Sequence, residues 1–111
     1  MLCLSSIEFE TLIAKIFEEQ GYFVPAYKGG SLENIDLVCE KDGEKKSIQI
    51  KLQMEEEHYD EDIDLYYCII NNAIPTDNIK NCEIIKEELK NCPNTKYWLN
   101  RTLDWVICND E

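Results

Sequence analysis

Residues 34–51, NIDLVCEKDGEKKSIQIK, limit the possible folds of this chain more than any other segment. Apolar and polar residues alternate on both sides of Asp42-Gly43, which is the pattern of two half-buried strands. Asp-Gly favours a two-residue turn because both central residues of such a turn need positive φ. The segment therefore predicts a tight antiparallel β-hairpin.

The turn also sets the register of the predicted hairpin. This register forms two opposite-charge pairs near the turn, Lys41 with Glu44 and Glu40 with Lys45. A shift of one residue would lose both pairs. The same register places Asp36 opposite Gln49, with Lys51 on the diagonal. Opposed Cβ atoms lie about 4.5–5.5 Å apart and diagonal ones about 7–8 Å, so Asp36, Gln49 and Lys51 are expected to converge as in a hydrolytic metal site.

An acid on one strand, followed after a short turn by Gln-x-Lys, resembles the PD-(D/E)xK nuclease superfamily. Gln49-Ile50-Lys51 is most similar to the Mrr-like restriction endonuclease branch. Further residues of that branch recur in order before Asp36, namely Phe9-Glu10, Gly21-Tyr22, Gly29-Gly30 and Glu33. Archaeal Holliday-junction resolvases have a similar layout. The resemblance covers residues 5–53 and implies an α/β, restriction-endonuclease-like core, with a central mixed sheet of about four to five strands flanked by helices.

The resemblance implies catalytic roles for Asp36, Gln49, Lys51 and Glu10. Asp36 would be the central ligand of Mg²⁺ or Mn²⁺, and the backbone carbonyl of Ile50 a second ligand. Lys51 would orient or help to deprotonate the attacking water and offset charge on the scissile phosphate. Glu10 would reach the site from the first helix as an outer-sphere or second-metal acid.

Two positions depart from the commonest pattern of the superfamily. Gln49 stands where most relatives have Glu or Asp, and its amide oxygen can ligate a hard cation without adding charge. Glu33 replaces the Asp usual three residues before the strand acid, which leaves its role as a ligand open. Ordinary alternatives also remain, since Asp36 and Glu10 can be solvated acids and Lys51 a guard against edge-to-edge aggregation.

The flanking elements are predicted from capping and periodicity. Ser5, with Glu8 three residues later, starts a helix that Gly21 ends. An apolar stripe marks its buried face, formed by Phe9, Leu12, Ile13, Ile16 and Phe17. Strands are expected at 22–24, 65–74 and 105–107.

A second helix is predicted to open after Pro75, with Thr76 or Asp77 as its cap. Its inward face comprises Ile79, Cys82, Ile85 and Leu89, and it ends before Pro93. Trp98 and Trp105 are expected to pack in the core rather than to stack on bases.

Composition predicts one domain, residues 1–111, with a single hydrophobic core. The six cysteines show no Cys-x-x-Cys pair, so buried free thiols in a reducing compartment are expected. No apolar run is long enough to span a membrane, and the first four residues do not form a signal peptide. We therefore expect a cytoplasmic protein.

The formal net charge of −12 argues against tight binding of DNA, because proteins that grip DNA usually present a basic face. Seven of the ten residues from 55 to 64 are acidic, and this run begins soon after Lys51. It would repel a phosphate backbone if it lay over the site. A solvated loop is the interpretation we favour from the sequence.

Three classes of function remain open. The first, which the sequence favours, is a metal-dependent DNA nuclease of defence or repair, with a homodimer or partner helping to hold the substrate. The second is a catalytically weakened nuclease fold whose acidic surface binds a basic protein, as an immunity factor, inhibitor or DNA mimic. The third is a subunit of a larger defence complex. The form of the substrate is left open.

Overall fold

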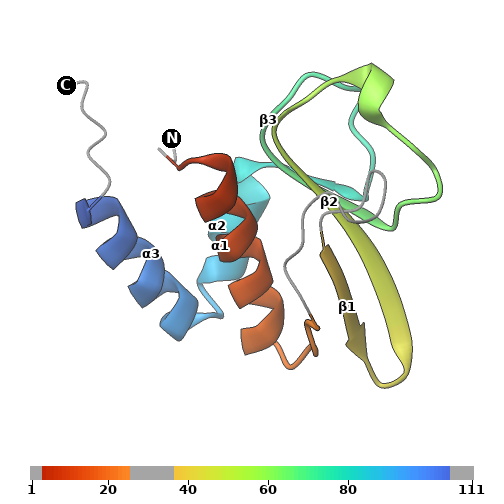
Figure 1. Ribbon diagram of the computed structural model, residues 1–111. Helices are drawn as coiled ribbons and strands as arrows, with labels where there is room; N and C mark the ends of the chain where they lie inside the picture. The colour runs from red at the N-terminus through yellow and green to blue at the C-terminus, as the bar shows by residue number, and fades with distance from the viewer. Residues whose placement is uncertain (1–3, 26–36, 106–111) are drawn as a thin grey trace.

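The computed structural model describes residues 4–25 and 37–105, without the side chains of residues 104 and 105. Its elements are α1 (Ser6–Glu19), β1 (Leu37–Lys41), β2 (Glu44–Met54), η1 (Glu56–His58), β3 (Leu65–Asn71), β4 (Ile79–Lys80), α2 (Cys82–Leu89) and α3 (Pro93–Trp105). The strands form one sheet in the order β1-β2-β3-β4. Figure 1 shows α1, α2 and α3 gathered on one side of this sheet. The expected α/β core, with a mixed sheet flanked by helices, is confirmed.

Helix α1 begins and ends as the sequence predicts. Ser5 and Glu8 form a reciprocal capping box at its start. At its end Gly21 has a φ of 97°, and the amides of Gly21 and Tyr22 donate to the carbonyls of Glu18 and Phe17. The rings of Phe17 and Tyr22 also pack edge to face at 5.0 Å. These contacts form a Schellman motif with its usual apolar pair, which fixes where the chain leaves the helix.

The β1–β2 hairpin has the predicted turn and register. Asp42 has a φ of 54° and Gly43 a φ of 84°. A two-residue turn of this type requires positive φ at both positions. Glu40 pairs with Lys45 and Lys41 with Glu44, and the described ladder ends where Leu37 pairs with Ile48. The predicted pairing of Asp36 with Gln49 lies outside the described residues.

Strands β2 and β3 are parallel neighbours, with Gln49 paired to Tyr66. Parallel strands cannot be joined by a tight turn, so the chain must travel back along the sheet from Met54 to Leu65. Residues 55–64, which include η1, make this return (Figure 1, green). We call residues 55–64 the crossover segment.

The sheet buries apolar residues on both faces. The helix-covered face holds Leu4, Phe9, Leu12, Ile13, Ala14, Ile16, Phe17, Leu37, Cys39, Ile48, Ile50, Tyr67, Ile85, Leu89, Cys92 and Leu99. A smaller group lies beneath the crossover segment and comprises Met54, Ile63, Tyr66, Cys68, Ala73 and Ile79, with Tyr59 packed against it. The whole apolar stripe of α1 is buried in the first group, as predicted.

The strand predicted at 22–24 is wrong. Among the described residues, only Phe23 of this stretch pairs with the sheet, through a single antiparallel bridge to Glu40. Pro25 follows two residues later and has no amide hydrogen to continue a ladder. The aromatic and β-branched residues therefore did not extend into a strand.

The helix predicted after Pro75 begins later in the chain. Asn81 is the N-cap of α2, and its side chain accepts from the amide of Ile84 at 3.2 Å. Ile79 lies in β4, where it pairs with Tyr66 and is buried beneath the crossover segment. The position of Ile79 in the sequence fits the spacing of an apolar helix face, but in the structure Ile79 belongs to a strand.

The strand predicted at 105–107 is also wrong at Trp105, which ends α3. Val106 and Ile107 lie outside the described residues. Pro93 follows the end of α2, as predicted, and it also opens α3, where a first-turn position needs no amide hydrogen. Trp98 packs against the core from α3, as expected for a packing residue.

The four described cysteines are free thiols. Cys39, Cys68 and Cys92 are buried and Cys82 is partly exposed. Desolvation raises the pKa of Cys39 and of Cys68 to about 11, which keeps both protonated at neutral pH. Within residues 4–25 and 37–105, no helix is both long and apolar enough to cross a membrane.

Candidate functional site

Gln49 and Lys51 project from the same face of β2, because alternate residues of a strand share a face. Their partners on β3 are Tyr66 and Cys68, so this is the face covered by the crossover segment. Ile50 lies between them, and its side chain enters the core beneath the helices. The strand thus presents an amide and an ammonium side by side on the face opposite α1.

A cavity of about 370 Å³ opens on this face. Strand β2 supplies Gln49 and Lys51 to its lining, and the crossover segment supplies Glu57, His58, Tyr59, Asp60 and Glu61. Acids of the run therefore share a cavity with two residues of the Gln-x-Lys motif. Five of the seven acids of the run are exposed, as expected for a solvated loop, but three of the seven also line this cavity.

The side chain of Gln49 is the most unusual group in the cavity lining. Gln49 is only 6% exposed, and among the described residues its Oε1 atom has no hydrogen-bond partner. An unpaired polar atom of this kind costs about 1–3 kcal/mol. Such an oxygen needs a donor or a cation, and carbonyl-type oxygens are ordinary ligands of hard divalent cations.

Tyr66 holds the crossover segment against the sheet. Its hydroxyl accepts from the amide of Asp60 and donates to the carbonyl of Asp60 at 3.0 Å. Burial raises the pKa of the Tyr66 hydroxyl, which keeps it protonated as a donor. The Tyr66 ring stacks on Tyr59, with 5.3 Å between centroids, and Ile63 is buried beside it. The crossover segment is therefore packed in place.

Several acids of the crossover segment have structural partners. Glu55 accepts from Gln53 at 2.6 Å and from Asn72 at 3.1 Å. Hydrogen bonds from Asn72 and then Gln53 lower the pKa of Glu55. At the other end of the segment, Asp64 accepts from the amide of Ser47 at 2.8 Å. Both ends are thus tied to neighbouring strands by carboxylates.

Of the other predicted site residues with side-chain roles, the structure describes only Glu10. Glu10 is half-buried on α1 and does not line the cavity. Asp36 and Glu33 lie outside the described residues. The motifs of the sequence did not indicate that Tyr59 and Asp60 line this cavity or that Tyr66 supports it. One signal was present, because the nearly continuous apolar run of LYYCII is typical of a parallel strand. Recognising that strand as parallel would have implied a crossover over one face.

The described residues do not form a conventional cluster of metal ligands. Among them, no three or more His, Cys, Asp or Glu side chains are grouped so that they could hold a metal ion. The lining residues that could supply ligands are instead Gln49 of β2 and four residues of the crossover segment, Glu57, His58, Asp60 and Glu61. Most of these groups offer oxygen, which suits Mg²⁺ or Mn²⁺, and the imidazole of His58 is the one nitrogen ligand type among the described lining residues.

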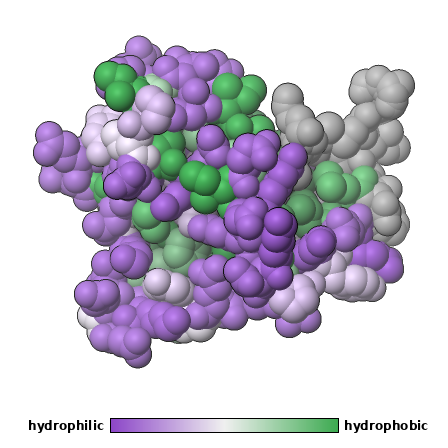
Figure 2. Space-filling model, turned by 180° about the vertical axis from the view of Figure 1, so that it is seen from behind, coloured by the Kyte–Doolittle hydropathy of each residue, from purple (hydrophilic) through white to green (hydrophobic). Residues whose placement is uncertain are grey.

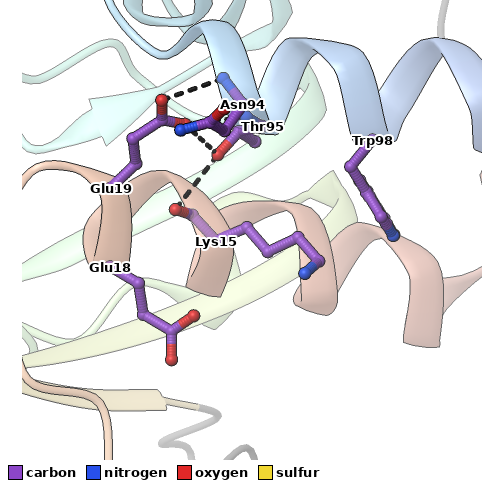
Figure 3. A pocket seen from close by; sticks show the side chains of 6 residues that line it. All are labelled: Lys15, Glu18, Glu19, Asn94, Thr95 and Trp98. Atoms are coloured by element: carbon purple, nitrogen blue, oxygen red, sulfur yellow. Dashed lines mark hydrogen bonds between the residues drawn. The ribbon is translucent and has the colours of Figure 1, made fainter.

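The residues of a second hollow, between α1 and α3, hold these two helices together (Figure 3). Glu19 accepts from the amides of Asn94 at 2.9 Å and Thr95 at 2.7 Å, at the first turn of α3. Lys15 lies 5.5 Å from the centre of the Trp98 ring along the same groove. Burial opposes ionisation of Glu19, but the hydrogen bonds from Thr95 and Asn94 lower its pKa overall. Glu19 thus caps α3 from a neighbouring helix.

The comparisons with known proteins agree with this fold and motif. The Mrr_cat family model, described as restriction endonuclease, matches residues 2–66, which is more than half of the chain. Comparisons with curated proteins and with solved structures gave no significant match. The family supports nuclease activity of the restriction-endonuclease type. This chain belongs to the Mrr_cat restriction endonuclease family.

Proposed function

We propose that this protein is a Mg²⁺- or Mn²⁺-dependent nuclease that hydrolyses DNA phosphodiester bonds in defence or repair. Asp36, Gln49 and the carbonyl of Ile50 would hold the cation, with Glu10 and Glu33 as further acids. Lys51 would act on the attacking water and the scissile phosphate. A homodimer is the arrangement we propose for cutting both strands, and the cytoplasm is the proposed location.

One observation carries this proposal more than the others. Gln49 and Lys51 share a cavity on one face of β2, and the buried Gln49 oxygen lacks a partner among the described residues. Continuing the observed β1–β2 register by one residue would place Asp36 opposite Gln49. A cation held there would satisfy the unpaired oxygen.

The chemistry assigns a separate task to each residue. When bound, a divalent cation supplies a nucleophilic hydroxide and neutralises charge on the phosphate. The Gln49 oxygen would orient the cation without adding a negative charge that opposes the substrate. Lys51 is half-buried at the cavity, so its ammonium would act on a phosphate in a partly desolvated setting where charge is screened less.

The test is cleavage of plasmid, linear and single-stranded DNA with Mg²⁺ or Mn²⁺. Asp36→Ala and Lys51→Ala should each lower the rate at least about a hundredfold. Lys45→Ala is the matched control, because Lys45 is an exposed lysine on the same strand near the hairpin turn. Cleavage that survives both Asp36→Ala and Lys51→Ala would reject this assignment of the catalytic residues.

A second candidate is a nuclease fold that binds a basic protein through its acidic surface, or that serves as a subunit of a defence complex. The net charge of −12 and the acids beside Lys51 favour it. Figure 2 shows one face on which hydrophilic residues predominate and apolar residues form small separate patches. If no DNA is cut under any metal condition, while a basic protein binds tightly and salt-sensitively, this candidate replaces the first.

A further inference from the structure

We propose that the crossover segment supplies Asp60 as a ligand of a divalent cation, which it shares with Gln49 of β2. The inference deepens the proposed function and rests on it for the identity of the site. It adds a ligand from a segment that lies outside the Gln-x-Lys hairpin. The carboxylate of Asp60 would supply the negative charge that Gln49, being neutral, does not provide from β2.

The buried amide of Gln49 points to a cation rather than an anion. Its Oε1 atom is an acceptor only, and it is left without a donor among the described residues. Glu57, Asp60 and Glu61 line the same cavity, where Lys51 is the one lysine or arginine among the described lining residues. Oxygen acceptors therefore outnumber cationic groups around a space that also has room for coordinated water.

Asp60 is the best positioned of these three acids. It is partly buried, whereas Glu57 and Glu61 are exposed. Tyr66 fixes both its amide and its carbonyl. Its Oδ1 atom accepts from the amide of Asp62 at 2.9 Å, which orients the carboxylate. Such support lowers the cost of holding the side chain in one arrangement for a cation.

A cation bound in the acidic cavity would make the crossover segment compatible with a phosphate substrate. Without a cation, carboxylates beside Lys51 repel phosphate and compete for the ammonium. A divalent cation between Gln49 and Asp60 would neutralise part of this negative charge. Glu57 and Glu61 would strengthen cation binding by their charge alone, without contacting the ion.

Binding of Tb³⁺ measures this site without DNA. Tyr59 lines the cavity, so excitation of tyrosine should sensitise luminescence of bound Tb³⁺, and Mn²⁺ should compete for it. Asp60→Asn should weaken binding at least about tenfold, as expected for loss of a carboxylate ligand. Asp62→Asn is the matched control, because Asp62 lies in the same segment, has the same charge and does not line the cavity. The Tb³⁺ affinity of Asp62→Asn should differ from that of the wild type by less than about twofold.

A second variant separates loss of the ligand from loss of the fold. Gln49→Met removes the unpaired oxygen and keeps a similar shape, so the metal-free protein should be at least as stable as the wild type. The rise in thermal midpoint that Mn²⁺ gives the wild type should shrink in Gln49→Met and in Asp60→Asn alike. Equal shifts in all three proteins would overturn the inference.

The outcomes distinguish this inference from the proposed function. Cation binding that depends on Asp60 and Gln49 supports the inference, even if the wild type cuts no DNA and the nuclease proposal fails. Unchanged Tb³⁺ affinity in Asp60→Asn overturns it, even if the wild type cuts DNA. A third outcome is that Asp60→Asn binds DNA more strongly than the wild type in the presence of a chelator, while its Tb³⁺ affinity is unchanged. This outcome would show that Asp60 only screens the charge of Lys51, and it would also overturn the inference.

Discussion

The two faces of the sheet are covered in different ways. Three helices bury one face with a continuous apolar core, where the buried Tyr67 donates to the half-buried Glu88 at 3.3 Å. The crossover segment covers the other face with fewer apolar residues, and there the Gln49 oxygen is unpaired among the described residues. We therefore expect the first face to contribute most of the stability, and we propose that the chemistry takes place on the second.

The largest expected effect is on the helix-covered face. Ile13 is fully buried, and Ile13→Ala would leave a cavity there. The change should lower the free energy of unfolding by about 3 kcal/mol, measured by urea unfolding. Ile7→Ala on the same helix is the control, since Ile7 is 75% exposed. It should cost less than about 0.5 kcal/mol. Similar losses in both variants would contradict the assignment of stability to this core.

Tyr66→Phe tests the attachment of the crossover segment. It removes the hydroxyl that holds Asp60 and keeps the ring stacked on Tyr59. We expect a loss of about 1 kcal/mol in the free energy of unfolding. Amide hydrogen exchange should accelerate in residues 55–64 and stay unchanged in α1. Tyr59→Phe is the control, because the only hydrogen bond of the Tyr59 hydroxyl to a described residue is a long one of 3.4 Å to Asn78. Uniform acceleration throughout the chain would mean that the two faces open together.

Cys39 and Cys68 report opening of the two faces without any mutation. Both are fully buried, with Cys39 beneath the helices and Cys68 beneath the crossover segment. If the crossover face opens more easily, Cys68 should be alkylated several-fold faster than Cys39, since about 1.4 kcal/mol in opening energy is tenfold in rate. Peptide mapping by mass spectrometry resolves the sites. Equal rates would indicate one cooperative unit.

The smallest expected effect concerns pH. Burial raises the pKa of Glu88 above its ordinary 4.5, against smaller opposing effects of Tyr67 and Lys80. A raised pKa in the folded state means that the Glu88 contribution to stability is present below pH 4.5 and is lost as pH rises through the folded pKa. Glu88→Gln should therefore be the more stable protein at neutral pH, with the advantage shrinking on acidification. Thermal unfolding at several pH values checks this.

Glu19 has a pKa shift opposite in sign to that of Glu88, so its effect on stability should depend on pH in the opposite way. Its lowered pKa means that its contribution is present above pH 4.5 and is lost as pH falls through the folded value. Glu19→Gln should therefore destabilise the protein at neutral pH and have less effect in acid. If Glu19→Gln and Glu88→Gln shift stability in the same direction at neutral pH, at least one of these assignments is wrong.

Local features of the sequence determined α1, the hairpin and the Gln-x-Lys arrangement. A capping box, an apolar stripe and a glycine after the helix act within a few residues, and Asp42-Gly43 sets a register that propagates along two strands. Gln49 and Lys51 share a face for the same local reason. The resemblance to Mrr-like nucleases also followed from these short motifs, and the family match confirms it.

Tertiary structure alone decided what covers that face. The apolar run of LYYCII is typical of a parallel strand, but the strand that it pairs with depends on contacts far apart in the chain. Parallel pairing forces the acidic residues 55–64 to cross the sheet, where Tyr66 anchors Asp60 beside Gln49 and Lys51. The sequence alone therefore determined the motif, and the parallel pairing determined its acidic surroundings.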